Sequence, residues 1–317
     1  MQSYRKINFP HGIMFHHFHD NKKHKKSQGS LPAKILKKII KRFGKKNILD
    51  AQVFHKKFIE NNLKKNHMCL TFDDGIKSQI DIALPILKKY KIKAFFFIYS
   101  SILTNKPDNL EIYRYFRCNH FDNIDKFYQM FFDEVKINLN KFFNNKRKKI
   151  FRMKKIFSYY SINDIKFRIL RDDLLTKKQY DQIMKNLFKK KNFQPKKFFY
   201  KIFMSKRDIK KLISEGHSIG LHSHSHPTNL KKLTRQEQLN EYKRNKSTLY
   251  KFTKNIYSMS HPCGSYNKST LKLLNKIGIE IGFKQHLFIE KNLGMKKINN
   301  SNLEIARRDS SDFLKNT

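Results

Sequence analysis

The sequence predicts an α/β protein, and three apolar stretches indicate that class. Met68–Gly75 (MCLTFDDG) is an apolar run stopped by two carboxylates and a glycine, which is typical of a buried strand followed by a functional loop. Gly216–Pro227 (GHSIGLHSHSHP) repeats this pattern with three histidines. Ala94–Tyr99 is apolar throughout, as in a strand covered on both faces. At 317 residues, the chain can form one large α/β barrel or two ordinary domains.

Segments with helical spacing alternate with these runs. Ile80–Tyr90 has its apolar residues at helical spacing, so residues 68–99 predict a strand–helix–strand unit. Other expected elements are, in chain order, a strand at Gly12–Phe18, helices at Ser30–Phe43, Asp50–Leu63, Ser205–Gly216, Thr234–Phe252 and Ser269–Ile277, and strands at Ile279–Phe283 and Leu303–Arg308.

The stretch 105–194 differs from the rest of the chain. It contains no glycine and is rich in lysine and aromatic residues. Because Phe127, Phe131 and Val135 lie at helical spacing, we expect a mostly helical insertion packed over the mouth of the core, where inserted segments reshape substrate access. No internal repeat or soft linker is visible, which predicts a single domain over residues 1–317.

The formal net charge is +44, and lysine supplies most of it. The lysines run from end to end and accompany frequent Asn, Ile and Phe, which is typical of a biased genome composition. No motif for sequence-specific nucleic-acid binding is present, so we expect no specific nucleic-acid partner. Basic runs such as Lys146–Lys149 are more often solvated surface than binding sites. The charge still favours anionic substrates or contact with an anionic membrane face.

Targeting and redox signals are few. Cys69, Cys118 and Cys263 are far apart and form no C-x-x-C pair, which argues against a disulfide framework. The N-terminus has no apolar run of signal-peptide length, and no stretch approaches the roughly 18 apolar residues of a membrane span. We therefore expect a cytoplasmic protein without a transmembrane segment, with peripheral membrane contact left open.

The two polar strand ends carry the chemistry. The adjacent carboxylates of Asp73 and Asp74 repel each other, so a positive group is expected beside them. His222, His224 and His226 alternate with serines, and an extended backbone would point all three imidazoles to one side. Two imidazoles and one carboxylate form an open ligand set for a catalytic Zn²⁺ with room for a water.

Both stretches resemble the motifs of the polysaccharide deacetylase (NodB-homology) family, of the carbohydrate esterase type. That family has a T-F-D-D-G strand end and a later H-[S/T]-x-x-H, which correspond here to Thr71–Gly75 and His222–His226. The resemblance implies that Asp73 is the catalytic base. It also implies that the metal ligands are Asp74, His222 and His226, with His224 behind them.

The resemblance also implies an irregular (β/α) barrel with a helical insertion. On this basis the catalytic core comprises residues 67–104 and 195–310, and the insertion comprises residues 105–194. Residues 1–66 form an N-terminal extension.

The third motif departs from the family pattern. The family often has R-x-P-Y or A-Y-P-Y-G-x-Y, and this chain has Ser260–Tyr266 (SHPCGSY), where the backbone N–H of Cys263 is expected to serve the oxyanion. The family's arginine falls at Ser260 and is missing. We expect Arg308 to replace it by pairing with Asp73, and Arg307 to point to the opposite side of the strand.

The histidine that serves as general acid in the family also has no counterpart at its usual place in this chain. In the family a late Leu-x-His supplies it, but no histidine follows His286 in this chain. The candidates are His16, His17 and His261.

The resulting hypothesis is a metal-dependent deacetylase that hydrolyses the N-acetyl or another N-acyl group of a sugar. Zn²⁺ suits the ligand set best, although other divalent transition metals fit it nearly as well. The expected substrate is a nucleotide- or lipid-linked precursor of a surface glycan. The alternatives are a catalytically inactive basic protein that binds glycans or polyanions, and an enzyme that hydrolyses another amide such as a formyl group.

Overall fold

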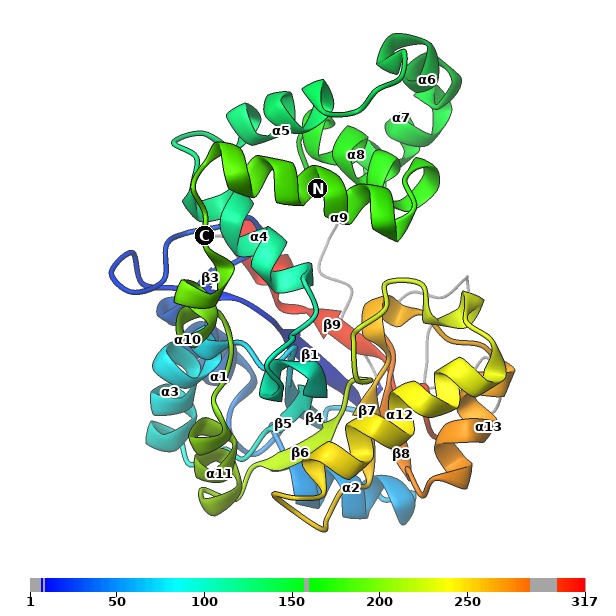
Figure 1. The fold of residues 1–317 in the computed structure, drawn as a ribbon. Helices are drawn as coiled ribbons and strands as arrows, with labels where there is room; N and C mark the ends of the chain where they lie inside the picture. The colour runs from blue at the N-terminus through cyan, green and yellow to red at the C-terminus, as the bar shows by residue number, and fades with distance from the viewer. Residues whose placement is uncertain (1–6, 8, 157–159, 286–300, 317) are drawn as a thin grey trace. The chain divides into compact units, whose positions relative to one another are not determined.

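The computed structural model describes residues 7, 9–156, 160–285 and 301–316. The chain forms two compact units (Figure 1). One unit comprises Met1–Asp108 and Tyr200–Thr317, and the other comprises Asn109–Phe199. Both site motifs, Thr71–Gly75 and His222–His226, lie in the first unit.

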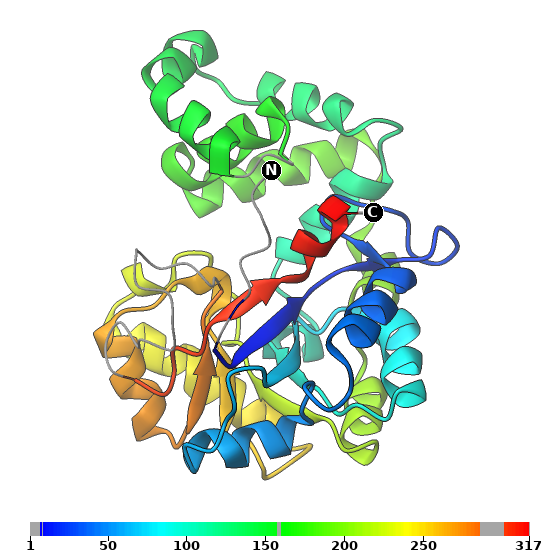
Figure 2. The ribbon, with the colours of Figure 1, turned by 180° about the vertical axis from the view of Figure 1, so that it is seen from behind.

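The first unit is built on a seven-stranded parallel sheet with the order β8-β7-β6-β5-β4-β1-β9. Figure 2 shows β9 beside β1. The strands are β1 (His11–Phe15), β4 (Met68–Asp73), β5 (Phe95–Ile98), β6 (Ser218–Leu221), β7 (Ser258–Ser260), β8 (Ile281–Phe283) and β9 (Arg307–Asp309).

The sheet curls until its two ends meet. Ile305, just before β9, donates its N–H to the Gly282 carbonyl at 2.8 Å, and Lys284 donates to the Ile305 carbonyl at 2.9 Å. A Cβ at Gly282 would lie 2.8 Å from Leu303 Cα, so this approach requires glycine. The predicted (β/α) barrel is therefore confirmed, in a nearly closed form.

Helices cover the barrel, since strands buried on both faces need an outer layer. In α1 the residues Ile35, Leu36, Ile39 and Ile40 form the buried face. The α-helices of this layer are α1 (Ala33–Phe43), α2 (Ala51–Ile59), α3 (Leu84–Lys89), α11 (Lys206–Ser214), α12 (Arg235–Leu249) and α13 (Lys268–Lys276). The shorter elements of this unit are two strands, β2 (Phe18–His19) and β3 (Leu31–Pro32), and the helical turns Gln79–Ala83, Ser100–Leu103, Leu230–Lys232, Pro262–Gly264 and Ser310–Asn316. The short helix α10 (Phe199–Ile202) contains the point in the sequence at which one unit ends and the other begins.

The strand register decides which side chains enter the barrel. Phe95 and Phe97 of β5 pack inside with Phe283 of β8. Because Asp73 pairs with Phe97 across the β4–β5 ladder, its side chain shares this interior face at the carboxyl end of β4. Phe72 points to the other face and stacks on Phe96.

The segment 1–66 contributes a strand to the central sheet. Its strand β1 lies between β4 and β9, with Phe15 opposite Phe72. The boundaries predicted for the extension, core and insertion stay predictions, as does the place of the insertion over the barrel mouth.

The second unit is helical. Aromatic side chains fill its core, including Phe116, Phe127, Phe131 and Phe167. Its elements are α4 (Leu110–Asn119), α5 (Ile124–Asp133), α6 (Leu139–Asn145), α7 (Arg147–Ile156), α8 (Ile162–Ile169), α9 (Lys177–Lys190) and the turns Leu170–Leu174 and Pro195–Phe198.

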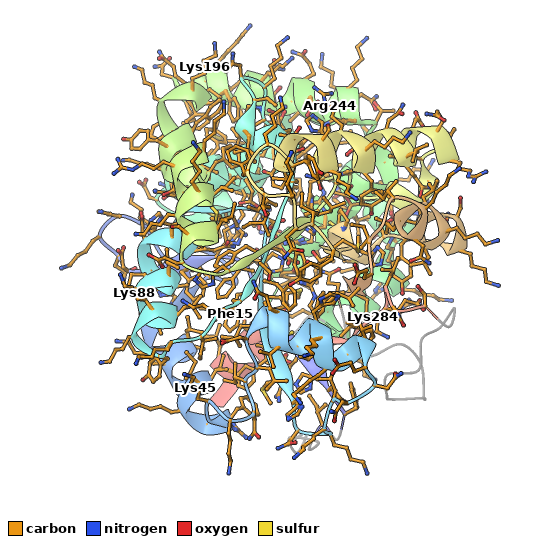
Figure 3. All side chains as sticks on the ribbon, turned by 90° about the horizontal axis from the view of Figure 1, so that it is seen from below. Phe15, Lys45, Lys88, Lys196, Arg244 and Lys284 are labelled. Atoms are coloured by element: carbon orange, nitrogen blue, oxygen red, sulfur yellow. The ribbon has the colours of Figure 1, made fainter. Side chains whose placement is uncertain are left out.

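Most of the lysines lie outside these cores. Lys45, Lys88 and Lys196 are exposed and their side chains project outward, whereas Phe15 is buried (Figure 3). None of the helices in the described part of the chain is long and apolar enough to cross a membrane.

Candidate active site

The acidic pair sits where β4 ends. The strand stops at Asp73, and the backbone turns away through Asp74 (φ 76°) and Gly75 (φ 64°). A Cβ at residue 75 would lie 2.6 Å from Ile102 Cδ1, so both the conformation and the space require glycine there.

Left-handed backbone is concentrated in the loops that form the site. Eight described residues other than glycine have positive φ, and four of them are Asp74, Ser223, His226 and Cys263. Each such residue costs of order 1–3 kcal/mol and persists only where its surroundings hold it. The contacts around these loops therefore keep them in conformations that they would not adopt alone.

Asp74, His222 and His226 each direct one ligand atom to a common point. Asp74 Oδ1 lies 3.2 Å from each Nε2 atom, and the two Nε2 atoms are 3.1 Å apart. All three side chains are buried. Atoms bound tetrahedrally to Zn²⁺ at about 2.0–2.1 Å stand roughly 3.3 Å apart, so this spacing fits one divalent ion.

The donor set also fits a cation chemically. His222 Nδ1 lies 2.9 Å from the Ser260 carbonyl oxygen, which can only accept a hydrogen bond. Nδ1 therefore carries the proton, and Nε2 presents a lone pair to the cluster, as in metal-ligating histidines. Asp74 Oδ1 is buried and accepts no hydrogen bond from the described residues. A positive ion would balance these lone pairs.

Helix α12 holds the histidine loop. Asn245 Oδ1 accepts the His222 N–H at 2.9 Å, and its Nδ2 donates to the Ile98 carbonyl at 2.9 Å. One turn earlier, Glu241 accepts hydrogen bonds from the backbone N–H groups of His224 and Ser225 at 2.9 and 2.8 Å. The i, i+4 spacing of Glu241 and Asn245 places both on one face of the helix.

The expectation that the three imidazoles alternate along an extended backbone is wrong. β6 ends at Leu221, and positive φ at Ser223 (61°) and His226 (52°) turns the loop. His224 Nδ1 pairs with Ser100 Oγ at 2.8 Å and lies outside the Asp74 cluster. The loop thus places residues four apart, not two apart, at the cluster.

Asp73 forms a buried ion pair with Arg307, the first residue of β9. Arg307 Nη1 lies 2.7 Å from Asp73 Oδ1, and both side chains are at most 2% exposed. Arg307 Nε also donates to the Lys284 carbonyl at 2.9 Å. Burial alone would raise the pKa of Asp73, but the Arg307 guanidinium together with the nearby His222 and His16 lowers the pKa below its ordinary value. Asp73 is therefore an ionised carboxylate.

The predicted pairing of Arg308 with Asp73 is wrong by one residue. Arg307 is paired with Gly12 in the β1–β9 ladder, and a Cβ at Gly12 would lie 3.0 Å from Arg307 Cγ, so glycine makes room for its stem. Arg308 points away from the barrel interior, with its guanidinium 4.4 Å from the Phe313 ring centroid and 3.8 Å from the Asp312 carboxylate.

A sequence signal for this register exists. Ile305 belongs to the same buried cluster as Phe95, Phe97 and Phe283 inside the barrel. Because side chains alternate with a period of two, Arg307 lies on the same face as Ile305. The spacing Leu303, Ile305, Arg307 therefore indicates which arginine enters the barrel.

Among the candidate acids, His16 lies at the carboxylates. Its Nε2 is 3.8 Å from Asp73 Oδ2 and 4.0 Å from Asp74 Oδ2, and its side chain is 31% exposed. The buried Gln79 connects the segment after β1 with the end of β4. Its Nε2 donates to the His16 carbonyl at 2.9 Å and to the Asp73 carbonyl at 2.6 Å. No sequence pattern pointed to Gln79.

The other two candidates are placed differently. His261 is buried, its ring stacks on Tyr266 at 4.1 Å, and burial lowers its pKa to about 3, so it is neutral. Its Nε2 donates to the Leu303 carbonyl at 2.8 Å. The His17 ring lies 6.4 Å from that of His16.

Cys263 is exposed at the left-handed turn Pro262–Gly264 that follows β7. Ser260, at the end of β7, holds His222, so the third motif does contact the cluster. The expected role of the Cys263 N–H at an oxyanion stays a prediction.

The parallel β/α barrel places a carboxylate beside an Asp–His–His cluster at its strand ends, a combination that suits metal-assisted hydrolysis. The comparisons identify the family. The family model described as "Polysaccharide deacetylase" matches residues 60–116 and 172–282, more than half of the chain. The chain therefore belongs to the polysaccharide deacetylase family, whose members are hydrolases that act on N-acetyl groups of polysaccharides. The predicted enzyme class is confirmed.

Solved structures share the fold at low identity. The Streptococcus pyogenes deacetylase PplD in complex with acetate has a TM-score of 0.54 at 15% identity, covering 97% of this chain and 96% of that one. IcaB from Ammonifex degensii gives 0.54 at 13%, covering 95% and 91%. A de-N-acetylase from Aggregatibacter actinomycetemcomitans gives 0.53 at 14%, covering 97% and 98%. A search of the curated proteins gave no match.

Proposed function

We propose that the protein is a divalent-metal-dependent N-deacetylase of a sugar, with Zn²⁺ as its metal. The convergence of Asp74 Oδ1 and two Nε2 atoms within 3.2 Å, beside an ionised carboxylate, carries this proposal. A divalent ion bound there would polarise the acetyl carbonyl and lower the pKa of a bound water toward ~7.

Asp73 is the proposed base. Its Oδ1 is occupied by Arg307, so Oδ2 is the atom that takes the proton from the attacking water. Arg307 keeps the carboxylate ionised and fixes its orientation. The water oxygen adds to the acetyl carbon, and the Cys263 N–H is proposed to donate a hydrogen bond to the resulting oxyanion.

His16 is the proposed acid. It is the candidate histidine that lies within 4.0 Å of both carboxylates, and its partial exposure allows a substrate to reach it. As the C–N bond breaks, His16 Nε2 would give a proton to the amine nitrogen. The products are acetate and a free amino sugar.

The substrate is proposed to be a nucleotide- or lipid-linked precursor of a surface glycan. The net charge of +44 supports a phosphate-bearing substrate, since such a field attracts anions. The cytoplasmic location expected from the sequence stays a prediction.

Metal analysis combined with acetate release tests this function. The purified protein should hold about one divalent ion and release acetate from N-acetyl sugars, faster when they carry a diphosphate. His16→Gln should keep the metal and lose turnover. Wild-type protein that binds glycans but neither holds metal nor releases acetate would contradict the proposal and favour the inactive binding protein.

A further inference from the structure

Helix α7 has an unusual composition for a helix of a globular unit. Its ten residues, Arg147–Ile156, include six basic residues and no acidic one. It also carries an exposed large hydrophobic side chain, Phe151, at 74% exposure.

Five exposed residues of α7 share one face. Arg147, Phe151 and Lys155 are spaced by four residues, and Lys148 and Arg152 lie beside them, so these five side chains form a continuous basic face around one aromatic ring. All five are exposed. We call this set the α7 basic face.

The four cations of this face differ from the other two on the helix. Lys149 pairs with Asp173 at 2.6 Å, and Lys154 donates to the Tyr160 carbonyl at 2.6 Å. No carboxylate of the described part of the chain lies within 4.0 Å of Arg147, Lys148, Arg152 or Lys155. The face is therefore a set of unneutralised charges.

Composition alone does not produce this arrangement. Helix α1 also carries exposed lysines, but its large aliphatic residues, Ile35, Leu36, Ile39 and Ile40, are all buried. On α7 a Phe occupies the centre of the charged face instead, where water surrounds most of the ring.

We propose that the α7 basic face docks on an anionic bilayer surface. The four cations would meet lipid phosphates, each worth about fivefold in binding. Phe151 would enter the boundary between headgroups and acyl chains, as aromatic residues of interfacial helices do. A single-stranded nucleic acid fits less well, since it uses several stacking rings along a basic groove and this face is a helix surface with one ring.

Flotation with vesicles tests this proposal on the full chain. Vesicles of phosphatidylcholine with one quarter phosphatidylglycerol should bind the protein, and pure phosphatidylcholine should not. The variant Arg147→Gln, Lys148→Gln, Arg152→Gln, Lys155→Gln should lower binding by about 100-fold or more at low salt. Phe151→Ala should lower it by about 5- to 20-fold, and this loss should persist in 0.5 M salt because it is apolar.

Matched control variants remove four positive charges, or one exposed apolar side chain, at sites outside the α7 basic face. Lys34→Gln, Lys37→Gln, Lys41→Gln, Lys45→Gln on and after α1 should lower binding by less than threefold, and Ile162→Ala, at another exposed apolar residue, should leave it unchanged. Circular dichroism should be the same for all variants. An α1 variant as weak as the α7 variant, or full binding by Phe151→Ala, would overturn the proposal. So would single-stranded DNA binding that depends on Phe151 while vesicle binding does not.

Discussion

The Asp74 cluster and the Asp73–Arg307 pair lie side by side, yet they are built in different ways. The cluster comes from two short motifs, each at the end of its own strand, and the family model covers all three of its residues. Arg307 lies outside the matched residues and reaches Asp73 from β9. The cluster residues are thus encoded locally, whereas the ion pair of Asp73 depends on how the barrel closes.

The largest effect is expected within the cluster. His222→Ala removes one of the three proposed ligands. The metal affinity should therefore fall by more than the roughly 10- to 100-fold that is typical when a residue hydrogen-bonded to a ligand is removed. Acetate release should fall with it. Metal titration by calorimetry measures the change, and an unaltered affinity would mean that the cluster is not the metal site.

Arg307→Met tests the other region through stability. It leaves Asp73 buried without its cation, which should lower the free energy of unfolding by roughly 3–5 kcal/mol in metal-free protein. Arg308→Met, at the half-buried neighbour, is the control and should cost much less. Equal losses would contradict the observed register.

The same pair predicts a pH dependence. Arg307 lowers the pKa of Asp73 in the folded state despite its burial, so the pair stabilises the protein above the unfolded pKa of about 3.9. The stability gap between wild type and Arg307→Met should be smallest below about pH 4, where Asp73 is protonated in the unfolded state, and should grow as the pH rises until it passes the pKa that burial raises in the variant. Urea unfolding of metal-free protein at several pH values measures it. A gap that widens toward acid would contradict this assignment.

Asn245→Ala probes a contact behind the cluster. It removes the acceptor of the His222 N–H and the donor to Ile98, so metal affinity should fall by about 10- to 100-fold while the fold persists. Asn240→Ala, on the exposed side of the same helix, should leave the affinity unchanged.

The smallest effect is expected at Gly12. Its new methyl group in Gly12→Ala would press on the Arg307 stem at 3.0 Å, so turnover should drop severalfold while the metal is kept. Gly29→Ala is the opposite case, a glycine with open space but positive φ, which should affect stability alone. Metal loss in Gly12→Ala would mean that the two regions are not separate.

The sequence predicted what depends on local patterns. The TFDDG strand end and the histidine segment indicate the barrel class and the three residues that meet in the cluster, because a strand end and its loop are continuous in the chain. Arg307 was missed because either member of a two-arginine run can enter the barrel. The alternation of Leu303, Ile305 and Arg307 indicates the register, and the ladder with β1 fixes it. His16 was left among three candidates because the sequence alone does not show which histidine lies beside the carboxylates. Glu241 and Asn245 had a usable signal, an i, i+4 polar pair on a helix, but nothing indicated what they bind.

Parallel analysis of Asp73→Asn and Asp74→Asn tests the central claim most directly. If Asp73 is the base beside a metal held by Asp74, Asp73→Asn should keep about one ion per chain and lose acetate release by ~10²–10⁴-fold. Asp74→Asn should lose the ion itself. Equal metal loss in both variants, or full turnover by Asp73→Asn with its metal in place, would contradict the division of roles between the two neighbouring carboxylates.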